Sequence, residues 1–432
     1  MTIKTTPYWW NELNRNENTL NVLPQSAQVV IIGAGITGLN AALTLAKAGR
    51  NIVVVDKEYP GFGASSRNAG YLSKAHLHSL STLIKKHGEE KAVTLVDEAC
   101  KAFDFTENLI ANEKIDCQYQ KSGRIYWAYS EKQAQTLAVE HATLNKHIKQ
   151  LNISSSLVGD SAHSDHMNSN QYCAGLSVPN SSTLHPGKYV QGLAEKVVAA
   201  GGIIAADTCV LKINNKQNVF TVETTRGNIN ATQVIVATNA YVGAETPYFR
   251  QRVVPVHGQM IALKAPSPEL LDKLLPNHIA HLDVRAMFRY WRRSPDNTHV
   301  LFGSRTGFGV SNPLAEADKL KALLVDIFPE LSSGTISHYW NGLLGGTMDQ
   351  FPHLGCHNGV HFAMGMNGHG VPMGSYLGDK IALKLLGQDG SETAFDKLSF
   401  DAAPLIKGKA WFMPVISGLQ ALADKLEKPL QK

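Results

Sequence analysis

A short stretch near the start of the chain constrains its fold more than any other part of the sequence. Residues 29–38 begin with four apolar residues of strand type that run directly into a Gly-x-Gly-x-x-Gly motif, and an apolar helical pattern follows. A second apolar strand then ends at Asp56. In such a unit, Gly33 permits the tight turn, Gly35 lets backbone N–H groups approach a pyrophosphate, and Gly38 lets the helix pack closely on the strand. The sequence therefore predicts a Rossmann-type dinucleotide-binding domain, with Asp56 placed to accept hydrogen bonds from ribose hydroxyls.

Length and composition are typical of a globular protein of about two domains. The 432 residues are 44% hydrophobic and 18% charged, and the formal net charge is +5. Because the lysines and arginines are scattered and their clusters are short, we expect no nucleic-acid partner. Residues 29–46 carry no charge, but three glycines and the switch from strand to helix interrupt them, so we expect no membrane span.

The cysteines and histidines indicate neither a disulfide framework nor a metal site. Five widely spaced cysteines without a Cys-x-x-Cys pair are typical of reduced thiols in a cytoplasmic protein. The first 26 residues are polar and lack the apolar core of a signal peptide, which also favours a cytoplasmic location. Histidines recur at positions 353, 357 and 361, but a proline and two glycines argue against the helix that would align them. We therefore expect no bound metal.

The order of predicted elements indicates an α/β (mixed α+β) fold with two interleaved domains. Strands typical of an antiparallel sheet, including one at 286–292, occupy the region 252–340. Further apolar strands are predicted at 203–213, 229–231 and 234–238. Helical patterns cover residues 80–112, 131–151, 185–200 and 374–386. The Rossmann-type domain is predicted to comprise residues 26–110, 184–250 and 339–432. The antiparallel-sheet substrate domain is predicted to comprise residues 111–183 and 251–338.

Both ends of the chain carry apolar side chains that we expect to pack on the body of the fold. The aromatic run at residues 8–10 predicts a plug against the domain that follows. Near the other end, apolar residues at helical spacing predict an amphipathic helix. These residues are Ile416, Leu419, Leu422 and Leu426. We expect this helix to dock on the chain itself rather than on a membrane.

Three further segments extend the dinucleotide motif across the chain. A glycine- and serine-rich loop occupies residues 63–70, a buried strand and its turn occupy 234–241, and a Gly-x-x-Gly-His-Gly segment occupies 365–370. Together with the first unit, and in this order, they resemble the FAD-dependent D-amino-acid-oxidase-like family, which includes glycine and sarcosine oxidases. Supporting matches lie at 185–190, 254–259 and 347–355. The resemblance therefore spans nearly the whole chain.

The resemblance implies that FAD is bound without a covalent link. Covalently flavinylated sarcosine oxidases have a cysteine just upstream of the Thr-x-Asp segment, whereas residues 342–346 of this chain contain none. The implied FAD-binding residues are Gly33, Gly35, Ile36, Thr37, Gly38, Asp56, Lys57, Ala64, Ser65, Ser66, Arg67, Asn68, Ala69, Gly70, Val210, Thr238, Asn239, Gly345, Gly368, His369, Gly370 and Val371.

The resemblance also implies a reaction. A hydride passes from the carbon that bears the nitrogen of an amine or amino acid to flavin N5, the resulting imine hydrolyses, and O₂ accepts the electrons to give H₂O₂. Two alternatives stay open: a dehydrogenase that passes electrons to a quinone or a carrier protein, and a flavoprotein that modifies another polypeptide. Nothing in the sequence specifies an oligomeric state.

Two residues are candidates for a catalytic role. His369 is a candidate hydrogen-bond donor near substrate and flavin, with the alternative that it only braces its loop. Arg67 either faces the flavin ring or a substrate acid, or forms an ion pair that holds its loop.

Aromatic residues are candidates for the wall of the substrate pocket, although aromatics in strand-rich segments also serve as core. The candidates are Tyr71, Tyr241, Tyr290 and Trp291. Arg292 and Arg293 either attract a carboxylate or lie at a solvated edge. Where sarcosine oxidases carry a lysine after the Gly-His-Gly, this chain has Pro372, which disfavours capture of a small amino-acid carboxylate. Within the family the motifs most resemble the γ-glutamylputrescine oxidase branch, so we expect an amine on an extended substrate.

Overall fold

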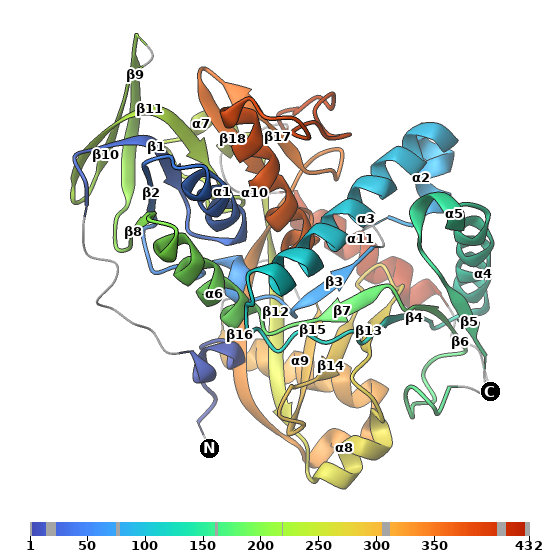
Figure 1. Cartoon of the computed structure of the whole chain (residues 1–432). Coiled ribbons are helices and arrows are strands. Elements are labelled where there is room, and N and C mark those ends of the chain that lie inside the picture. The colour runs from blue at the N-terminus through green and yellow to red at the C-terminus, as the bar shows by residue number, and fades with distance from the viewer. Residues whose placement is uncertain are drawn as a thin grey trace.

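Two eight-stranded β-sheets form the body of the chain (Figure 1). The computed structural model describes residues 2–13, 23–74, 78–159, 163–217, 219–304, 312–403 and 412–427. The first sheet comprises β17 (His353–His357), β18 (Val360–Met364), β11 (Gly227–Val236), β1 (Ser26–Ile32), β2 (Ile52–Val55) and β8 (Ile203–Ala205), with β10 (Val219–Thr224) and β9 (Val210–Lys216) extending from β11.

The first sheet is built around the strand that the dinucleotide motif predicts. β1 lies between β2 and β11 and runs parallel to both, with Val30 opposite Val53 and Val234. β8 runs parallel to β2, and β18 runs parallel to β11. The central strands are uninterrupted apolar runs because both faces of this sheet are covered. The predicted Rossmann-type unit is therefore confirmed.

Helices from distant parts of the chain gather on one face of this sheet. α1 (Ile36–Lys47) follows the glycine-rich turn, and α10 (Gly370–Leu386) packs against it. α3 (Glu89–Asn112) lies against α10, and α6 (Pro186–Ala199) flanks α1. This packing brings the Gly-His-Gly segment, which immediately precedes α10, to the same side of the sheet as the dinucleotide motif.

The second sheet takes its strands from two separate regions of the chain. In spatial order these are β16 (Thr335–Gly346), β12 (Val254–Lys264), β15 (His299–Ser304), β14 (Tyr290–Arg293), β13 (Ala280–Asp283), β4 (Arg124–Ala128), β6 (Ala174–Val178) and β5 (Ser156–Val158). All neighbouring pairs are antiparallel except β13 and β4, which are parallel. α8 (Pro268–Leu274) and α9 (Pro313–Ile327) cover one face, over a core that includes Trp127 and Phe302.

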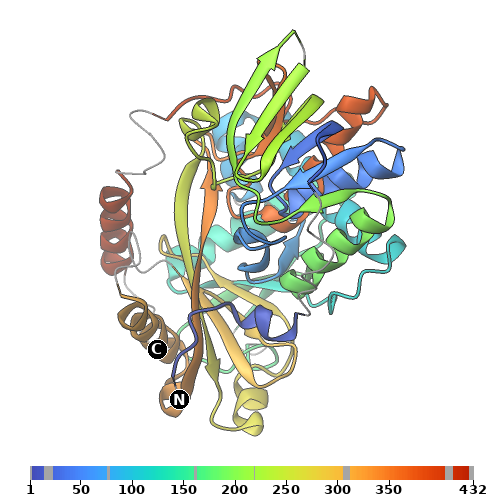
Figure 2. The same cartoon turned by 90° about the vertical axis from the view of Figure 1, so that its left-hand side faces the viewer.

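β12 and β16 are the longest of the described strands, and they run side by side from the second sheet to the first (Figure 2). They pair antiparallel over their whole length, with Lys264 opposite Thr335 at one end and Val254 opposite Gly346 at the other. The C-terminal end of β16 reaches residues 365–370, the segment that the family resemblance places at the flavin ring (the flavin-ring segment), because the Asn367 N–H donates to the carbonyl oxygen of Gly345 at 2.9 Å.

Shorter elements complete the fold. β3 (Tyr71–Ser73) and β7 (Ser181–Thr183) form a two-stranded sheet. The 3₁₀ helix η1 (Tyr8–Glu12) buries Tyr8 and Trp9 against the chain, which confirms the predicted aromatic plug. The others are α2 (Leu80–His87), α4 (Glu131–Lys146), α5 (Ile148–Leu151), α7 (Pro247–Arg250), α11 (Met413–Leu426), η3 (Ala64–Ser66) and η5 (Pro329–Ser333).

Several predicted element limits are wrong for local reasons. The helix predicted over 80–112 is two helices, because Gly88 adopts a φ of +83° between α2 and α3. The pattern over 131–151 divides at His147, and that over 203–213 divides into β8 and β9. The two strands predicted within 229–238 are the single strand β11, the strand expected at 286–292 is only β14, and α10 begins four residues before 374. The domain limits stay a prediction, and one of them, at 338/339, falls inside β16.

The C-terminal helix docks on the chain as expected, but not through its apolar side. α11 turns its polar side toward the chain, where the Asp424 carboxylate accepts the N–H groups of Ala286 and Met287 at 2.8 Å each. Three of the four residues expected to dock, Leu419, Leu422 and Leu426, are more than half exposed. The apolar spacing therefore predicted the helix correctly but not the face that it buries.

Candidate active site

A cavity of about 860 Å³ lies between the two sheets and collects residues from every predicted cofactor segment. The predicted residues that line it are Gly33, Gly35, Ile36, Thr37, Asp56, Lys57, Ala64, Ser65, Arg67, Asn68, Ala69, Val210, Thr238, Asn239, Gly345, Gly368, His369, Gly370 and Val371. Three others, Gly38, Ser66 and Gly70, shape its walls from behind. Segments that are hundreds of residues apart in the sequence thus meet around one space.

The glycine-rich turn at one end of the cavity leaves no room for side chains. Gly33 adopts a φ of +105°, and a methyl group there would lie 3.1 Å from the backbone carbonyl of Ala237. A methyl group at Gly38 would overlap the carbonyl oxygen of Gly33. Gly35 is the residue before the first turn of α1, and it has no side chain to cap the helix. The N–H groups and the partial positive charge of the helix N-terminus therefore lie next to the cavity.

Asp56 organises this turn from the end of β2. One carboxylate oxygen accepts the Ala34 N–H at 2.7 Å, and the other accepts the Glu58 N–H at 3.0 Å. Burial raises the pKa of Asp56, and the two backbone hydrogen bonds counteract that rise. Each carboxylate oxygen has a second lone pair, so the group can still accept hydrogen bonds from ribose hydroxyls.

The loop at 63–70 is held by its own side chains. The Ser65 hydroxyl accepts the Ile36 N–H at 3.0 Å, which ties the loop to the start of α1. Ser66 is buried, donates to the Gly61 carbonyl at 2.6 Å and accepts from the Trp10 indole at 2.8 Å. Asn68 bonds the backbone of its own loop at Ala64, Ser65 and Gly70. The loop is therefore fixed against the N-terminal aromatic plug.

Arg67 lines the cavity, but its guanidinium binds backbone oxygens. Nε donates to the Phe62 carbonyl at 2.7 Å, and an Nη donates to the Asn341 carbonyl of β16 at 3.2 Å. The guanidinium carbon also lies 4.6 Å from the centre of the Trp10 ring. These contacts join the loop to the second sheet, and the role of Arg67 toward flavin or substrate stays a prediction.

The flavin-ring segment also lines the cavity. Gly368 adopts a φ of +86° with open space where a side chain would lie. His369 is the residue before α10, and its Nε2 lies 3.1 Å from the carbonyl oxygen of Ser73 on β3. Burial lowers the pKa of His369 to about 4, so its imidazole is neutral at physiological pH. His369 therefore both lines the cavity and braces its loop against β3.

Tyrosines from β3, from the turn after β11 and from β14 of the second sheet line another part of the cavity. Tyr71 and Tyr290 line it together, with their ring centres 6.3 Å apart in an edge-to-face arrangement. Tyr241 also lines it, and its hydroxyl accepts the Leu343 N–H at 3.3 Å. Trp291 does not line the cavity. Successive residues of a strand point to opposite faces, so Trp291 points away from the side on which Tyr290 lies. It is fully buried on the far side of β14, stacked on Tyr172 and His281, so its assignment to the substrate pocket is wrong.

Neither Arg292 nor Arg293 reaches the cavity or lies at a solvated edge. Both are buried. Arg292 donates to the backbone carbonyls of Ala69 and Leu184 at 3.2 Å each. Arg293 donates to the Leu275 carbonyl at 2.9 Å and forms an ion pair with Asp272 at 2.5 Å. Both guanidiniums therefore hold the fold together, and the expectation that they attract a substrate carboxylate is wrong.

A further cation that lines the cavity is Arg124, which the sequence motifs did not single out. It lies on β4 with Tyr126, and an Nη donates to the Tyr126 hydroxyl at 3.2 Å. Its guanidinium carbon is 5.1 Å from the centre of the Tyr71 ring. The residue is only 9% exposed, its Nε has no hydrogen-bond partner, and no carboxylate of the described residues pairs with it. The one available signal was an arginine inside an otherwise apolar strand.

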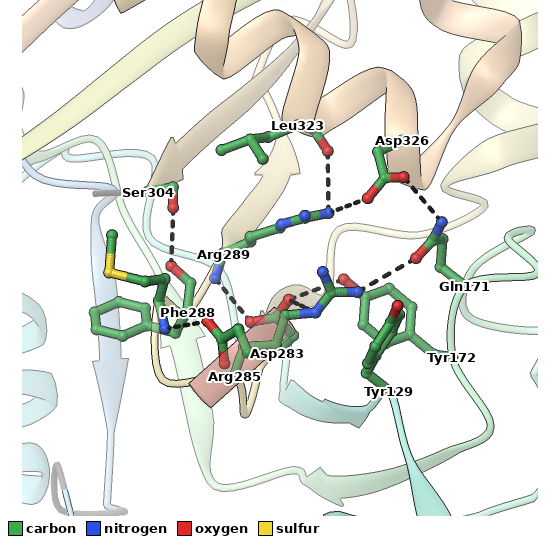
Figure 3. Close-up of polar contacts among 12 residues, drawn as sticks. Tyr129, Gln171, Tyr172, Asp283, Arg285, Phe288, Arg289, Ser304, Leu323 and Asp326 are labelled. Atoms are coloured by element: carbon green, nitrogen blue, oxygen red, sulfur yellow. Dashed lines mark hydrogen bonds and ion pairs between the residues drawn. The ribbon is translucent and has the colours of Figure 1, made fainter. Parts of the chain in front are cut away.

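A network of charges fixes the loop between β13 and β14, which carries Arg285 and Phe288 to the cavity (Figure 3). Asp283 is fully buried, accepts the Arg289 N–H at 2.8 Å and lies 3.3 Å from Nε of Arg285. Arg289 also pairs with Asp326 of α9 at 2.7 Å. Burial raises the pKa of Asp283 to about 6. The network ties this part of the cavity wall to the helix behind it.

Residues 28–383 match the profile of the family described as FAD dependent oxidoreductase. The chain belongs to this family. It is 29% identical to the Haemophilus influenzae protein named "Probable oxidoreductase OrdL" over 382 residues, 87% of this chain and 86% of that protein. It is 28% identical to gamma-glutamylputrescine oxidoreductase of Escherichia coli over 403 residues, 92% of this chain and 93% of that protein. The crystal structure of glycine oxidase from Geobacillus kaustophilus has a TM-score of 0.73 and 21% identity, and the match covers 89% of this chain and 100% of that one.

Membership of this family makes the protein an FAD-dependent oxidoreductase of amines or amino acids. Its FAD is bound without a covalent link, since residues 342–346 lack the cysteine of the covalently flavinylated sarcosine oxidases. The residues around the cavity fit this cofactor. The turn at Gly33 and Gly35 provides a cradle that side chains would fill, next to a helix N-terminus that suits a pyrophosphate. Further along, the Thr238 hydroxyl is buried at the cavity without a hydrogen-bond partner among the described residues.

The described part of the chain holds neither a cluster of metal ligands nor a membrane-spanning helix. No group of three or more potential ligand residues could hold a metal ion there. His353 and His357 lie on β17 and His361 lies on β18, so the three do not share a helix. No described helix is both long enough and apolar enough to cross a bilayer.

Proposed function

We propose that this FAD-dependent oxidoreductase oxidises the carbon–nitrogen bond of an amine on an extended substrate that also carries an acidic group, and that O₂ is its electron acceptor. The observation that carries the proposal is Arg124, a buried cation that faces the cavity without a carboxylate partner among the described residues. A buried charge of this kind is stable when an opposite charge joins it. γ-Glutamylated putrescine, which has an amine at one end and an amino-acid carboxylate at the other, is the leading candidate, and the name of the Escherichia coli relative supports it.

FAD, held at the turn that contains Gly33 and Gly35, would supply the acceptor for a hydride from the carbon next to the nitrogen, and O₂ would take up the two electrons. The chain positions the substrate for this step. Arg124 holds the acidic group, while the rings of Tyr71 and Tyr290 exclude water from the carbon–nitrogen bond. Because hydride loss requires an uncharged amine, removal of water from the cavity helps by lowering the pKa of a bound ammonium group. The resulting imine takes up water and releases a carbonyl compound.

The start of α10 contributes electrostatic stabilisation. This helix begins at Gly370, directly after His369, and no side chain caps it. The partial positive charge of a helix N-terminus stabilises negative charge that develops beside it. His369 supports this geometry, since its bond to Ser73 fixes the loop from which the helix starts.

A peroxide-coupled assay with purified holoenzyme tests the substrate. We expect γ-glutamylputrescine to give at least about tenfold higher kcat/KM than glycine or sarcosine, because only the longer substrate uses both ends of the cavity. If glycine or sarcosine is the best substrate, the extended-substrate proposal is wrong while the oxidase proposal stands.

A stopped-flow experiment tests the electron acceptor separately. Enzyme reduced by substrate without oxygen is mixed with air-saturated buffer or with a soluble quinone. Reoxidation by air within seconds supports the oxidase. Reoxidation by air over minutes, together with rapid reoxidation by the quinone, would assign the dehydrogenase alternative.

The location that we propose is the cytoplasm. All five cysteines are free thiols, which suits a reducing compartment. Fractionation of cells that produce the full chain tests this proposal, and recovery from an extracytoplasmic fraction would contradict it.

A further inference from the structure

The helix α11 is attached to the chain through its polar side. Besides the two hydrogen bonds to Asp424, the Glu427 carboxylate accepts the Ser130 hydroxyl at 2.6 Å. Ser417 on the same side is 7% exposed, and Gln420 lines the cavity. The acid of the helix, Asp424, and the acid that follows it, Glu427, are therefore both directed toward the body of the chain. The α11 helix, in dark red, lies on the outside of the molecule in Figure 2.

The outward side of α11 is apolar. The chain has thirteen exposed large hydrophobic side chains among its described residues, and five of them lie on this one helix. They are Val415, Ile416, Leu419, Leu422 and Leu426, with exposed fractions from 39% to 73%. Single exposed apolar residues are ordinary on a protein surface, but a continuous apolar stripe on one helix indicates a binding surface.

The stripe is too small to hold two copies of the chain together by itself. A helix of fourteen residues is about 21 Å long, and a stripe about 10 Å wide on it covers about 200 Å² per partner. Stable protein–protein interfaces bury about 1,200–2,000 Å² in total, several times what two such stripes provide.

Charge identifies a better partner. Residues 404–432 contain five lysines and two acids, and the two acids are the ones bonded inward. Lys425 on α11 is exposed beside the apolar stripe. An apolar stripe with positive charge beside it is the pattern of helices that lie in the surface of an anionic bilayer. We propose that the apolar face of α11 is a docking surface for an anionic lipid membrane, on which this helix lies parallel to the surface.

This docking is peripheral, since no described helix could cross the bilayer. Phe412, the residue before α11, lines the cavity, and so does Ile416, the least exposed residue of the stripe. The docked enzyme would therefore hold this side of its cavity next to the membrane. The inference is independent of the substrate proposed above.

Vesicle flotation of the flavin-containing full chain tests the proposal. Vesicles of phosphatidylcholine alone are compared with vesicles that contain one part phosphatidylglycerol to three parts phosphatidylcholine. We expect at least about tenfold more protein to float with the anionic vesicles at low salt, and most of it to be released at high salt because salt screens the lysines.

Variants separate the helix from general surface effects. The double variant Leu419→Glu, Leu422→Glu alters the stripe at residues outside the cavity lining, and it should lose vesicle binding while keeping its flavin content and its turnover. Val139→Glu is the matched control, because Val139 lies on helix α4 and is 51% exposed. It should float like the unmodified chain.

Three outcomes would overturn the proposal. The unmodified chain does not bind anionic vesicles at low salt, or the double variant binds as well as the unmodified chain. In the third, the unmodified chain does not bind vesicles but sediments as a dimer, and the double variant sediments as a monomer. A second copy of the chain would then occupy the stripe.

Discussion

Nε2 of His369 lies 3.1 Å from the backbone carbonyl oxygen of Ser73, and because a carbonyl can only accept, the imidazole donates its proton there. With a pKa near 4, this imidazole does not titrate between pH 6 and pH 9. We predict that His369→Ala lowers the rate of flavin reduction at saturating substrate by about tenfold, the effect of one lost hydrogen bond of about 1.4 kcal/mol. Anaerobic stopped-flow absorbance measures this rate. The pH profile should keep its shape in the variant, and loss of a step near pH 6.5 would show that His369 titrates.

Three buried histidines should make the fold sensitive to acid. Burial lowers the pKa of His185 and His369 to about 4 and that of His281 to about 3. Below pH 6.5 the unfolded chain binds protons at these three histidines, whereas the native chain does not. Their contribution to the free energy of unfolding is therefore complete above pH 6.5 and is lost as the pH falls toward the native pKa values. We predict a loss of about 2 kcal/mol per histidine between pH 6.5 and pH 5. Urea unfolding at the two pH values tests this, and equal stabilities would contradict it.

Gly38→Ala should weaken FAD binding without contacting the cofactor. The added methyl group would overlap the Gly33 carbonyl oxygen and push α1 away from the turn. Overpacking of this kind costs about 1–3 kcal/mol, and here it displaces the pyrophosphate cradle. Flavin absorbance per protein after dialysis is the measurement. Gly159→Ala is the control, since a methyl group there meets nothing within 4 Å, and it should keep its full flavin content.

Arg124 and Arg292 should respond differently to the same change. Arg124→Met is predicted to raise KM for an acid-bearing substrate by about 30-fold or more, the cost of a charge-assisted hydrogen bond of about 2 kcal/mol, with little change in kcat. Arg124→Lys should restore part of the affinity. Arg292→Met should lower stability instead, because the carbonyls of Ala69 and Leu184 lose their donor. Steady-state kinetics and urea unfolding separate the two effects, and an unchanged KM in Arg124→Met would contradict the assignment.

Tyr290 and Trp291 are neighbours on β14 with opposite surroundings. Trp291→Ala should destabilise the fold by about 3–5 kcal/mol, because it empties a fully buried site in the core of the second sheet. Tyr290→Ala should raise KM and cost much less stability, because Tyr290 faces the cavity. Thermal unfolding and kinetics on both variants provide the test. A large KM effect in Trp291→Ala without a loss of stability would reverse the assignment.

The parts of the site that the sequence predicts correctly depend on local geometry. The turn at Gly33 and the strand that ends at Asp56 follow from steric limits within about thirty residues, so their spacing alone predicts them. The aromatic plug at Trp9 follows equally from composition. Such features need no knowledge of which distant segments meet.

The errors arise where the outcome depends on distant partners. A strand of four residues such as β14 leaves open which face is buried until α8 and α9 cover one side, which is why Trp291 was assigned to the wrong face. The role of Arg124 could not be predicted for the same reason. Only the folded chain shows that Arg124 lines the cavity and that no described carboxylate pairs with it. The apolar spacing on α11 was correct, but Asp424 and Glu427 determine which side of the helix meets the chain.

The paired strands β12 and β16 have a consequence for how such an enzyme can diversify. β16 offers the Asn341 carbonyl to Arg67 at one point and the Gly345 carbonyl to the flavin-ring segment four residues later. An insertion of one residue between them would shift the far end by about 3.4 Å and turn every following side chain to the opposite face. New substrate preferences can therefore arise through replacements on the cavity face of the second sheet, whereas a change in the length of β16 would separate the substrate wall from the cofactor cradle.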